Sequence, residues 1–372
     1  MVQKVPQSGI SGNSSFRNMI TNGDMQISQR GTSFASMGNG DTQFTLDRFG
    51  WYEEGDHGAA EITITQDTDV PTGQGFTKSL KAVCATVDTS IDAGTIAYVS
   101  QKFEGQFLQH LAKGTSSAKS TTLSFWCKSN LTGTFTISVI DQDNTRMFST
   151  SYSPASANTW EKFIINIPAD TTGALDNDNA SSYRINWNLQ AGTNKSNGAL
   201  ASAWEAQAEG DRAVGQTNFY SSTSNNWYIT GVQWEIGDAA TDFEHLPHDV
   251  NLQRCMRYYT RYDASEGYTR YASGFINSST AAVAIMQLPV PMRAVPTIDH
   301  SGTAGDYSIY HGTTTTPCNS TPQLQVPSTG NDNATSVGLQ LDVSSGLTAG
   351  QGCIFLGTNA NTNNFFAFAS EL

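Results

Sequence analysis

Two runs of carboxylates and one pair of histidines carry the residue types that could do chemistry in this sequence. Asp141-Gln-Asp143 and Asp176-Asn-Asp178 could each begin a calcium-binding loop. The twelfth position of an EF-hand loop needs glutamate, however, and here it holds tyrosine in the first run and tryptophan in the second. Glu244-His245-Leu-Pro-His248 has metal-binding side chains, but its proline prevents the helical spacing that would bring them together. We therefore predict that 141–143 is a hairpin turn, that 176–178 is a solvated loop and that 244–248 is a turn at the exit from a domain.

Motifs for catalysis are missing from the sequence. Neither the nucleophile elbow G-x-S-x-G nor a phosphate-binding Walker sequence occurs. Two carboxylates could still serve as the acid and base of a glycosidase, but only across a cleft and at a separation that a sequence does not give. We expect that the protein is not an enzyme, and a polysaccharide depolymerase stays as an alternative.

Aromatic side chains are abundant in this chain, which has seven Trp, thirteen Tyr and only 14% charged residues. This composition indicates carbohydrate binding, because the apolar faces of sugars stack on indole and phenol rings. Trp126 and Trp187 lie in strand-like runs and are predicted to be core residues. The predicted glycan-stacking residues are the rings in or beside loops: Trp51, Tyr52, Trp204 and Tyr220. Packing in the core is the alternative for each of them.

Charge and cysteine content argue against several classes of protein. A formal net charge of −13 without a basic stripe argues against nucleic-acid binding. The longest apolar run, Ala281 to Met286, is far shorter than the roughly 20 residues of a membrane span, so no membrane insertion is expected. Five cysteines without a C-x-x-C pair predict small buried side chains rather than a disulfide framework, and assembly in the cytoplasm is therefore expected. The N-terminal residues lack the apolar stretch of a signal peptide and are not expected to be one.

Short runs that alternate apolar and polar residues recur along the chain and predict antiparallel strands with one buried face. The clearest runs in the first two-thirds are 61–65, 79–84, 121–127, 133–140, 160–167, 182–189 and 227–235. So many strands with few helices predict a jelly roll or β-sandwich. Similar runs at 281–288, 336–343, 353–356 and 364–369 predict a second, smaller β-sandwich, with 288–296 as an extended edge.

Helical spacing of apolar residues occurs at two places, over 104–113 and over 249–261. The second predicts a helix that links two domains. We therefore predict an all-β protein with an N-terminal jelly-roll or β-sandwich domain, a short linking helix and a smaller C-terminal β-sandwich domain. The predicted segments are an N-terminal docking arm (1–15), the jelly-roll domain (16–245), the linker helix (246–264) and the C-terminal β domain (265–372).

Several stretches, taken in order, resemble the tail-fibre and virion structural proteins of tailed bacteriophages. They are Asn18-Met-Ile-Thr-Asn-Gly-Asp-Met-Gln-Ile-Ser-Gln-Arg-Gly31, Leu46-Asp-Arg-Phe-Gly50, Leu123 to Phe135, Tyr228-Ile-Thr-Gly-Val-Gln-Trp-Glu-Ile-Gly237, Thr241 to His248 with Cys255-Met-Arg-Tyr-Tyr259, and Leu288 to Pro296 with the terminal Glu371-Leu372. The resemblance covers about residues 16–372. Its N-terminal part is also similar to the jelly roll of carbohydrate-binding modules, which implies a glycan-facing role.

In such modules a calcium ion is often held by the first strand and by an aspartate pair in the last strand. The last strand here reads Ile229-Thr-Gly-Val232, without those carboxylates, which leaves Asp24 as the candidate Ca²⁺ ligand. The segment 18–31 is expected to be the first strand, with a turn or bulge at Asn22-Gly23. Its predicted inward residues are Met19, Met25 and Ile27.

The resemblance implies a non-enzymatic structural protein of a tailed-phage virion, a compact fibre, spike or appendage, with host-surface glycans as the expected ligand. The alternative is a capsid decoration protein with a purely structural role. The expected partners are other virion proteins, in the tail or the capsid. A homotrimer is expected because such appendages are commonly trimeric, and aromatic residues at subunit contacts would serve assembly as readily as sugar binding. The expected location is the virion, assembled in the host cytoplasm.

Overall fold

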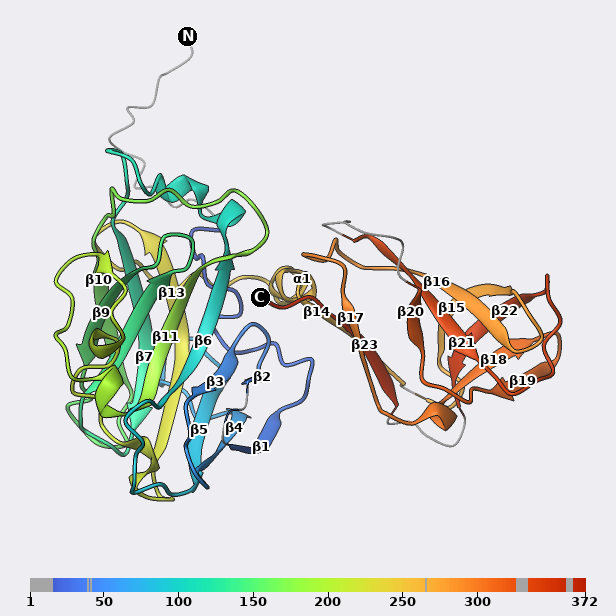
Figure 1. The fold of residues 1–372 in the computed structure, drawn as a ribbon, viewed down its shortest axis with the longest axis horizontal. Helices are drawn as coiled ribbons and strands as arrows, with labels where there is room; N and C mark the ends of the chain where they lie inside the picture. Colours follow the sequence, from blue (N-terminus) through green and yellow to red (C-terminus); the bar gives the residue numbers. More distant parts are fainter. Residues whose placement is uncertain (1–15, 39, 41, 265, 326–333, 359–363) are drawn as a thin grey trace, which may run out of the picture. The chain divides into compact units, whose positions relative to one another are not determined.

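The computed structural model describes residues 16–38, 40, 42–264, 266–325, 334–358 and 364–372, and the chain divides into two compact units, Met1–Asn251 and Leu252–Leu372. Both units are built mainly from antiparallel strands (Figure 1). The predicted all-β class and β-sandwich architecture are confirmed. The predicted docking arm, residues 1–15, lies outside the described residues. No helix in the described part of the chain is long and apolar enough to cross a membrane.

The first unit is a sandwich of two antiparallel sheets (Figure 1). In spatial order, the six-stranded sheet consists of β1 (Ser33–Gly38), β4 (Glu61–Asp67), β5 (Ser79–Thr86), β13 (Asn226–Ile236), β7 (Thr121–Ser129) and β10 (Glu161–Ile167). The seven-stranded sheet consists of β12 (Glu205–Ala206), β9 (Arg146–Tyr152), β8 (Phe135–Asp141), β11 (Ser181–Ala191), β6 (Ile96–Glu104), β3 (Gly50–Glu54) and β2 (Thr42–Phe44). Sequence-distant strands are neighbours in both sheets, as expected of a sandwich with crossover connections.

The core of the first unit lies between its sheets, because alternation along each strand sends every second side chain inward. Phe125 and Cys127 of β7 and Trp187 of β11 are fully buried there. The rings of Phe125 and Trp187 meet edge to face with their centroids 6.2 Å apart. All five cysteines of the chain are buried and none forms a disulfide, which confirms the prediction made from their spacing.

The segment 18–31 was expected to be the first strand, and this prediction is wrong. Asn22 adopts φ +60° and its carbonyl accepts a hydrogen bond of 3.0 Å from the Met25 amide, so the chain turns instead of extending. Gly23 then lies against β13 and accepts a hydrogen bond from the Val232 amide. A Cβ on Gly23 would be 2.1 Å from the Val232 carbonyl oxygen, so this close approach requires glycine. Of the three predicted inward residues, Met25 and Ile27 are buried and Met19 is half-buried.

Both predicted helices are shorter than expected. Residues 104–113 form two 3₁₀ turns, η2 (Gly105–Phe107) and η3 (Gln109–Leu111), and Ala112 ends the second by turning into the left-handed region at φ +48°. The linking helix α1 spans His248–Met256, and Tyr259 already belongs to a strand. The described residues also form the 3₁₀ helices η4 (Thr193–Lys195), η5 (Glu209–Asp211), η6 (Phe219–Ser221) and η7 (Ala304–Asp306).

The second unit has its own pair of antiparallel sheets. The smaller sheet consists of β14 (Tyr259–Asp263), β23 (Phe365–Ala369) and β17 (Thr297–His300). The larger consists of β19 (Thr314–Pro317), β18 (Tyr307–His311), β22 (Gly352–Gly357), β15 (Arg270–Ile276), β16 (Ala281–Gln287), β21 (Ser336–Asp342) and β20 (Gln323–Gln325). Residues 288–296, predicted as an extended edge, form an irregular connection. The core combines aliphatic residues with a group of rings, in which the centroid of Phe366 lies 4.8 Å from that of Tyr271 and 5.4 Å from that of Phe355.

Candidate functional site

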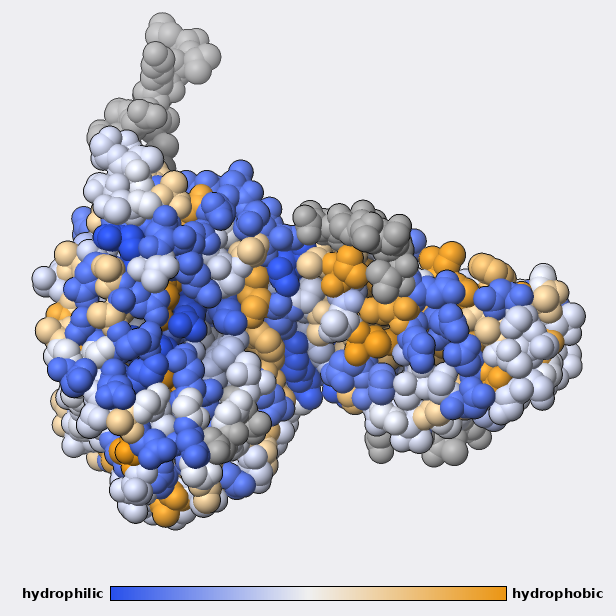
Figure 2. Space-filling view, in the orientation of Figure 1, coloured by the Kyte–Doolittle hydropathy of each residue, from blue (hydrophilic) through white to orange (hydrophobic). Residues whose placement is uncertain are grey.

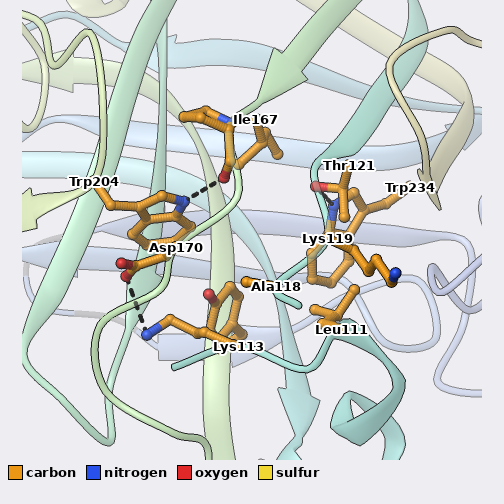
Figure 3. A pocket seen from close by; sticks show the side chains of 11 residues that line it. Leu111, Lys113, Ala118, Lys119, Thr121, Ile167, Asp170, Trp204 and Trp234 are labelled. Atoms are coloured by element: carbon orange, nitrogen blue, oxygen red, sulfur yellow. Dashed lines mark hydrogen bonds and ion pairs between the residues drawn. The ribbon is translucent and has the colours of Figure 1, made fainter. Parts of the chain in front are cut away.

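A small pocket opens at one end of the first unit, where β7 begins and β10 ends (Figure 3). Three aromatic residues from different strands and loops line it, namely Tyr183, Trp204 and Trp234. Leu111 and Ile167 add apolar surface, and Lys113, Lys119 and Asp170 add charge. An apolar wall with a few charged groups is the usual composition of a site for a small polar ligand.

Trp204 is the half-buried ring of this pocket, and its position is fixed by hydrogen bonds at both ends of the residue. Its indole Nε1 donates to the Pro168 carbonyl at 2.8 Å, and its own carbonyl accepts from Arg146 Nη2 at 3.1 Å. The ring packs against Tyr183 and Phe148, with centroids 5.5 and 6.4 Å away. A tryptophan held in this way offers a ligand a flat apolar surface at little further cost in conformational entropy.

Tyr183 and Trp234 form the back of the pocket. Their rings are stacked, with centroids 6.0 Å apart, and the Trp234 indole donates to Thr121 Oγ1 at 2.8 Å. Burial raises the pKa of Tyr183 far above its ordinary value, so its hydroxyl stays protonated. That hydroxyl has no hydrogen-bond partner among the described residues. It is therefore free to donate to a ligand in the pocket.

The charged residues of the pocket differ in how they are paired. Lys113 and Asp170 are buried and lie 3.1 Å apart (Nζ to Oδ2), as Figure 3 shows. Burial raises the pKa of Asp170, but hydrogen bonds from Arg146, the Thr172 amide and Lys113 outweigh it and hold the pKa below its ordinary value. Lys119 is exposed and forms no ion pair with another described residue, so it is the cation that a ligand can reach.

The four predicted stacking residues lie in different places, and only Trp204 lines the pocket. Trp51 and Tyr220 are each 0% exposed in the core of the first unit, so their assignment as rings open to a ligand is wrong. Trp51 is inward on β3 because its neighbour Tyr52 takes the outward position. Tyr220 is inward and its hydroxyl donates to the carboxylate of Glu53; burial, and then this contact, raise the pKa of Tyr220.

Tyr52 lies on the outer face of the seven-stranded sheet and is mostly covered. Its ring stacks on Tyr98 at 5.5 Å, and Lys102 Nζ lies 4.8 Å from its centroid. Beside this pair, the Tyr98 hydroxyl and Arg212 both donate to Glu54. Burial raises the pKa of Glu54, but these partners outweigh it and lower the pKa to about 2. Tyr52 therefore belongs to a charged aromatic network and shows little ring surface.

Asp24, the candidate calcium ligand, is buried and accepts a hydrogen bond from the Asn251 side-chain amide at 3.1 Å. Burial raises the pKa of its carboxyl, and the hydrogen bonds it accepts do not compensate. An amide N–H directed at the carboxylate does not suit a calcium site, which needs oxygen ligands. Across the described ranges no group of three or more His, Cys, Asp or Glu could hold a metal ion. The surroundings of Asp24 do not fit Ca²⁺.

Three aromatic residues on the outer face of the six-stranded sheet were missed by the sequence reasoning. Trp126, predicted to be core, is half-buried and points outward, because Phe125 and Cys127 on either side of it face the core. Trp160 packs edge-on against Tyr228 at 6.0 Å and its indole donates to Asp69 Oδ1 at 2.9 Å. The alternation of the strands carried the signal for Trp126 and Tyr228, since each directly follows an inward aromatic residue.

No family model and no curated protein matches this sequence. Solved structures similar to it include the enzymatically active domain of tailspike protein 4 of bacteriophage CBA120, at 15% identity and a TM-score of 0.31, over 60% of this chain and 22% of that chain. A family 11 carbohydrate-binding module of Clostridium thermocellum is similar at 12% identity and a TM-score of 0.28, over 56% of this chain and 97% of the module. TmCBM61, solved with β-1,4-galactotriose, is similar at 10% identity and a TM-score of 0.24, over 51% of this chain and 88% of that one. Likeness this low leaves the question of function to the residues of the chain.

Proposed function

We propose that the first unit binds a glycan through the pocket around Trp204. The observation that carries the proposal is the half-buried, hydrogen-bonded indole of Trp204 beside the unpartnered hydroxyl of Tyr183 and the exposed ammonium of Lys119. An apolar ring face, a hydroxyl behind it and an exposed cation beside it match a sugar, which has an apolar face and a rim of hydroxyl groups. The enclosed space is about the size of one water molecule, so the sugar lies across the mouth of the pocket and only a substituent enters it.

Binding of the full chain to a panel of purified bacterial surface polysaccharides tests this proposal. Trp204→Ala is expected to weaken binding by about tenfold or more, because loss of one ring contact of about 1.5 kcal/mol corresponds to that factor. Trp160→Ala, on the outer face of the six-stranded sheet, is the matched control and should leave binding unchanged. Calorimetric titration measures both variants. No binding by the unmodified protein, or equal binding by Trp204→Ala, would overturn the proposal.

For the whole chain, the proposed role is a non-enzymatic structural protein of a tailed-phage virion, displayed as a homotrimeric fibre, spike or appendage. Support comes from the stretches that, in order along the sequence, resemble tail-fibre proteins, and from the division of the chain into two β-sandwich units. Antibody labelling of intact particles in the electron microscope tests the location. Labelling of the tail is expected, and labelling of the head shell instead would favour a capsid decoration protein.

Incubation with the bound polysaccharide tests the absence of catalysis. No increase in reducing ends is expected over time. A release of reducing ends that depends on a carboxylate near the pocket would identify a depolymerase. Analytical ultracentrifugation tests the trimer: a single species of three times the 40.0 kDa chain is expected, and a monomer at all concentrations would refute it.

A further inference from the structure

The ammonium group of Lys113 is enclosed by four oxygen atoms. Its Nζ lies 2.6 Å from Asp141 Oδ2, 3.1 Å from Asp170 Oδ2, 2.7 Å from the Thr172 carbonyl oxygen and 2.8 Å from the Gly173 carbonyl oxygen. All three charged side chains are buried, with 3%, 0% and 4% of the side chain exposed for Lys113, Asp141 and Asp170. We call this set of four oxygen atoms the Lys113 cage.

The two carboxylates of the Lys113 cage are oriented by donors other than Lys113. Asp141, at the end of β8, accepts from the Asn144 side-chain amide at 3.0 Å and from its backbone amide at 3.1 Å. Asp170, after β10, accepts from Arg146 Nε at 2.8 Å and from the Thr172 amide at 3.0 Å. Because these donors persist without Lys113, the four oxygen atoms can stay together around a different cation.

Charge balance shows what the Lys113 cage requires. Asp141 and Asp170 bring two negative charges, and Lys113 and Arg146 bring two positive ones, so the buried group is neutral. Without Lys113 the group carries one net negative charge away from water, which is strongly unfavourable. Two carboxylates and two backbone carbonyls are also the type of donor that a hard divalent cation takes, as part of about six to eight oxygen ligands.

We propose that Lys113 acts as a built-in cation, in the place where a bound divalent ion would otherwise hold the turn at residues 170–173. This turn also supports the pocket. Asp170 orients Arg146, which donates to the Trp204 carbonyl, and Lys113 Nζ lies 5.8 Å from the centroid of the Trp204 ring. Lys113 is thus a positioning residue for Trp204. This inference follows from the geometry of the Lys113 cage and does not depend on glycan binding.

The test compares two variants of the full chain, Lys113→Ala, which empties the cage, and Lys113→Met, which keeps most of the side-chain volume without the charge. Lys119→Ala removes an exposed lysine of the same pocket and is the matched control. Thermal unfolding is followed by tryptophan fluorescence, since all seven tryptophans belong to the first unit. Each protein is measured alone, with millimolar CaCl₂, with millimolar propylammonium chloride, and with EDTA.

Lys113→Ala is expected to lower the melting temperature of the first unit by about 5–10 °C. Calcium or propylammonium should restore at least half of this loss in Lys113→Ala and none of it in Lys113→Met, where the methionine side chain occupies the space. The unmodified protein and Lys119→Ala should respond to neither cation nor to EDTA. If Lys113→Ala is recovered only as aggregate, the yield of refolding from urea is measured with and without each cation, and a higher yield with calcium or propylammonium is the expected result.

Three results would overturn the inference. One is a Lys113→Ala protein that melts at the temperature of the unmodified protein. Another is a loss in Lys113→Ala that no cation restores while Lys113→Met keeps the melting temperature of the unmodified protein, because the lysine stem would then matter through packing and not through its charge. A fall in melting temperature on adding EDTA to the unmodified protein would also contradict it.

Discussion

The two units of this chain are both antiparallel sandwiches, yet they fill their interiors differently. All seven tryptophans belong to the first unit, and the second builds its core from phenylalanine, tyrosine and aliphatic residues. The first unit also encloses ionised side chains, such as Lys113 and Asp141, and Arg212 with 1% of its side chain exposed. The same fold class therefore occurs here with one interior that contains buried ion pairs and with another that is mainly apolar.

Ion pairs of the two units show the contrast in detail. Arg212 of the first unit donates to Glu54 and Glu209 at 2.8 and 3.0 Å from beneath the surface. In the second unit, Arg261 pairs with Asp263 at 2.7 Å, but the Asp263 side chain is 60% exposed. Figure 2 shows that apolar residues reach the surface of the second unit in several patches. Buried ion pairs should therefore contribute to the unfolding free energy of the first unit, and surface ion pairs should contribute little to that of the second.

Asp141→Ala tests this contrast with the largest expected effect. It removes one partner of a fully buried pair and leaves Lys113 and Arg146 to share the single carboxylate of Asp170, so the group gains one net positive charge. This should cost the first unit about 3–5 kcal/mol of unfolding free energy. Urea denaturation followed by tryptophan fluorescence measures it. The matched change in the second unit is Asp263→Asn, measured by calorimetry, which should cost no more than about 1 kcal/mol. Equal losses in the two variants would show that burial of the pair does not decide its contribution.

Gly231→Ala should have the next largest effect. Gly231 adopts φ +62° on β13, and a Cβ there would lie 2.5 Å from Phe76 Cζ and 3.0 Å from Trp126 Cδ1. Gly312 of the second unit adopts φ +55°, and among the described residues no atom beyond its own chain neighbours lies within 4 Å of its Cβ position, so Gly312→Ala tests mainly the backbone strain. We expect about 1 kcal/mol for Gly312→Ala and about 1–3 kcal/mol more for Gly231→Ala. Similar losses at both sites would mean that Phe76 and Trp126 move aside freely.

Acid should weaken the first unit through carboxyls whose pKa is lowered in the folded state. The pKa of Glu54 falls to about 2 because its contacts with Arg212 and Tyr98 outweigh burial, and that of Asp170 is lowered as well. A depressed folded pKa gives stability that is present above the ordinary value of about 4.5 and is lost as pH falls through the folded value. The urea midpoint of the tryptophan signal should therefore drop between about pH 4.5 and pH 2. Glu54→Gln should start lower and fall less steeply, and an unchanged slope would contradict the assignment.

The sequence predicted the features that a single segment determines, and it missed those that depend on contacts between several segments. Strands such as β4, β7 and β11 were predicted correctly, because alternation of apolar and polar residues within a single segment is typical of an extended strand. The segment 18–31 alternates too, but its asparagine side chains and turn replace the ladder of a strand with other hydrogen bonds. A single-segment pattern does not show that competition.

The candidate site was predicted only in part, for two physical reasons. In Trp51-Tyr52, Phe125-Trp126 and Trp227-Tyr228, neighbouring aromatics must point to opposite faces, and a ring's distance from a loop does not say which one is inside. The Lys113 cage, in contrast, joins groups from the segment after η3, from β8 and from the turn after β10. Its residues look unrelated in sequence, because only the packing of three separate elements brings them together.

The smallest expected effect is that of Ile285→Ser in the second unit. Ile285 is 57% exposed on β16, whereas Ala284 and Met286 on either side of it are buried, so it lies on the outer face of the larger sheet. Because its side chain loses little contact with water on folding, Ile285→Ser should change the unfolding free energy by no more than about 0.5 kcal/mol. Calorimetry measures this against Leu339→Ala, which empties a fully buried position on neighbouring β21 and should cost about 2–5 kcal/mol. A large loss from Ile285→Ser would mean that the outer face of this sheet is covered in solution, and the apolar interior would then not be the main source of stability in the second unit.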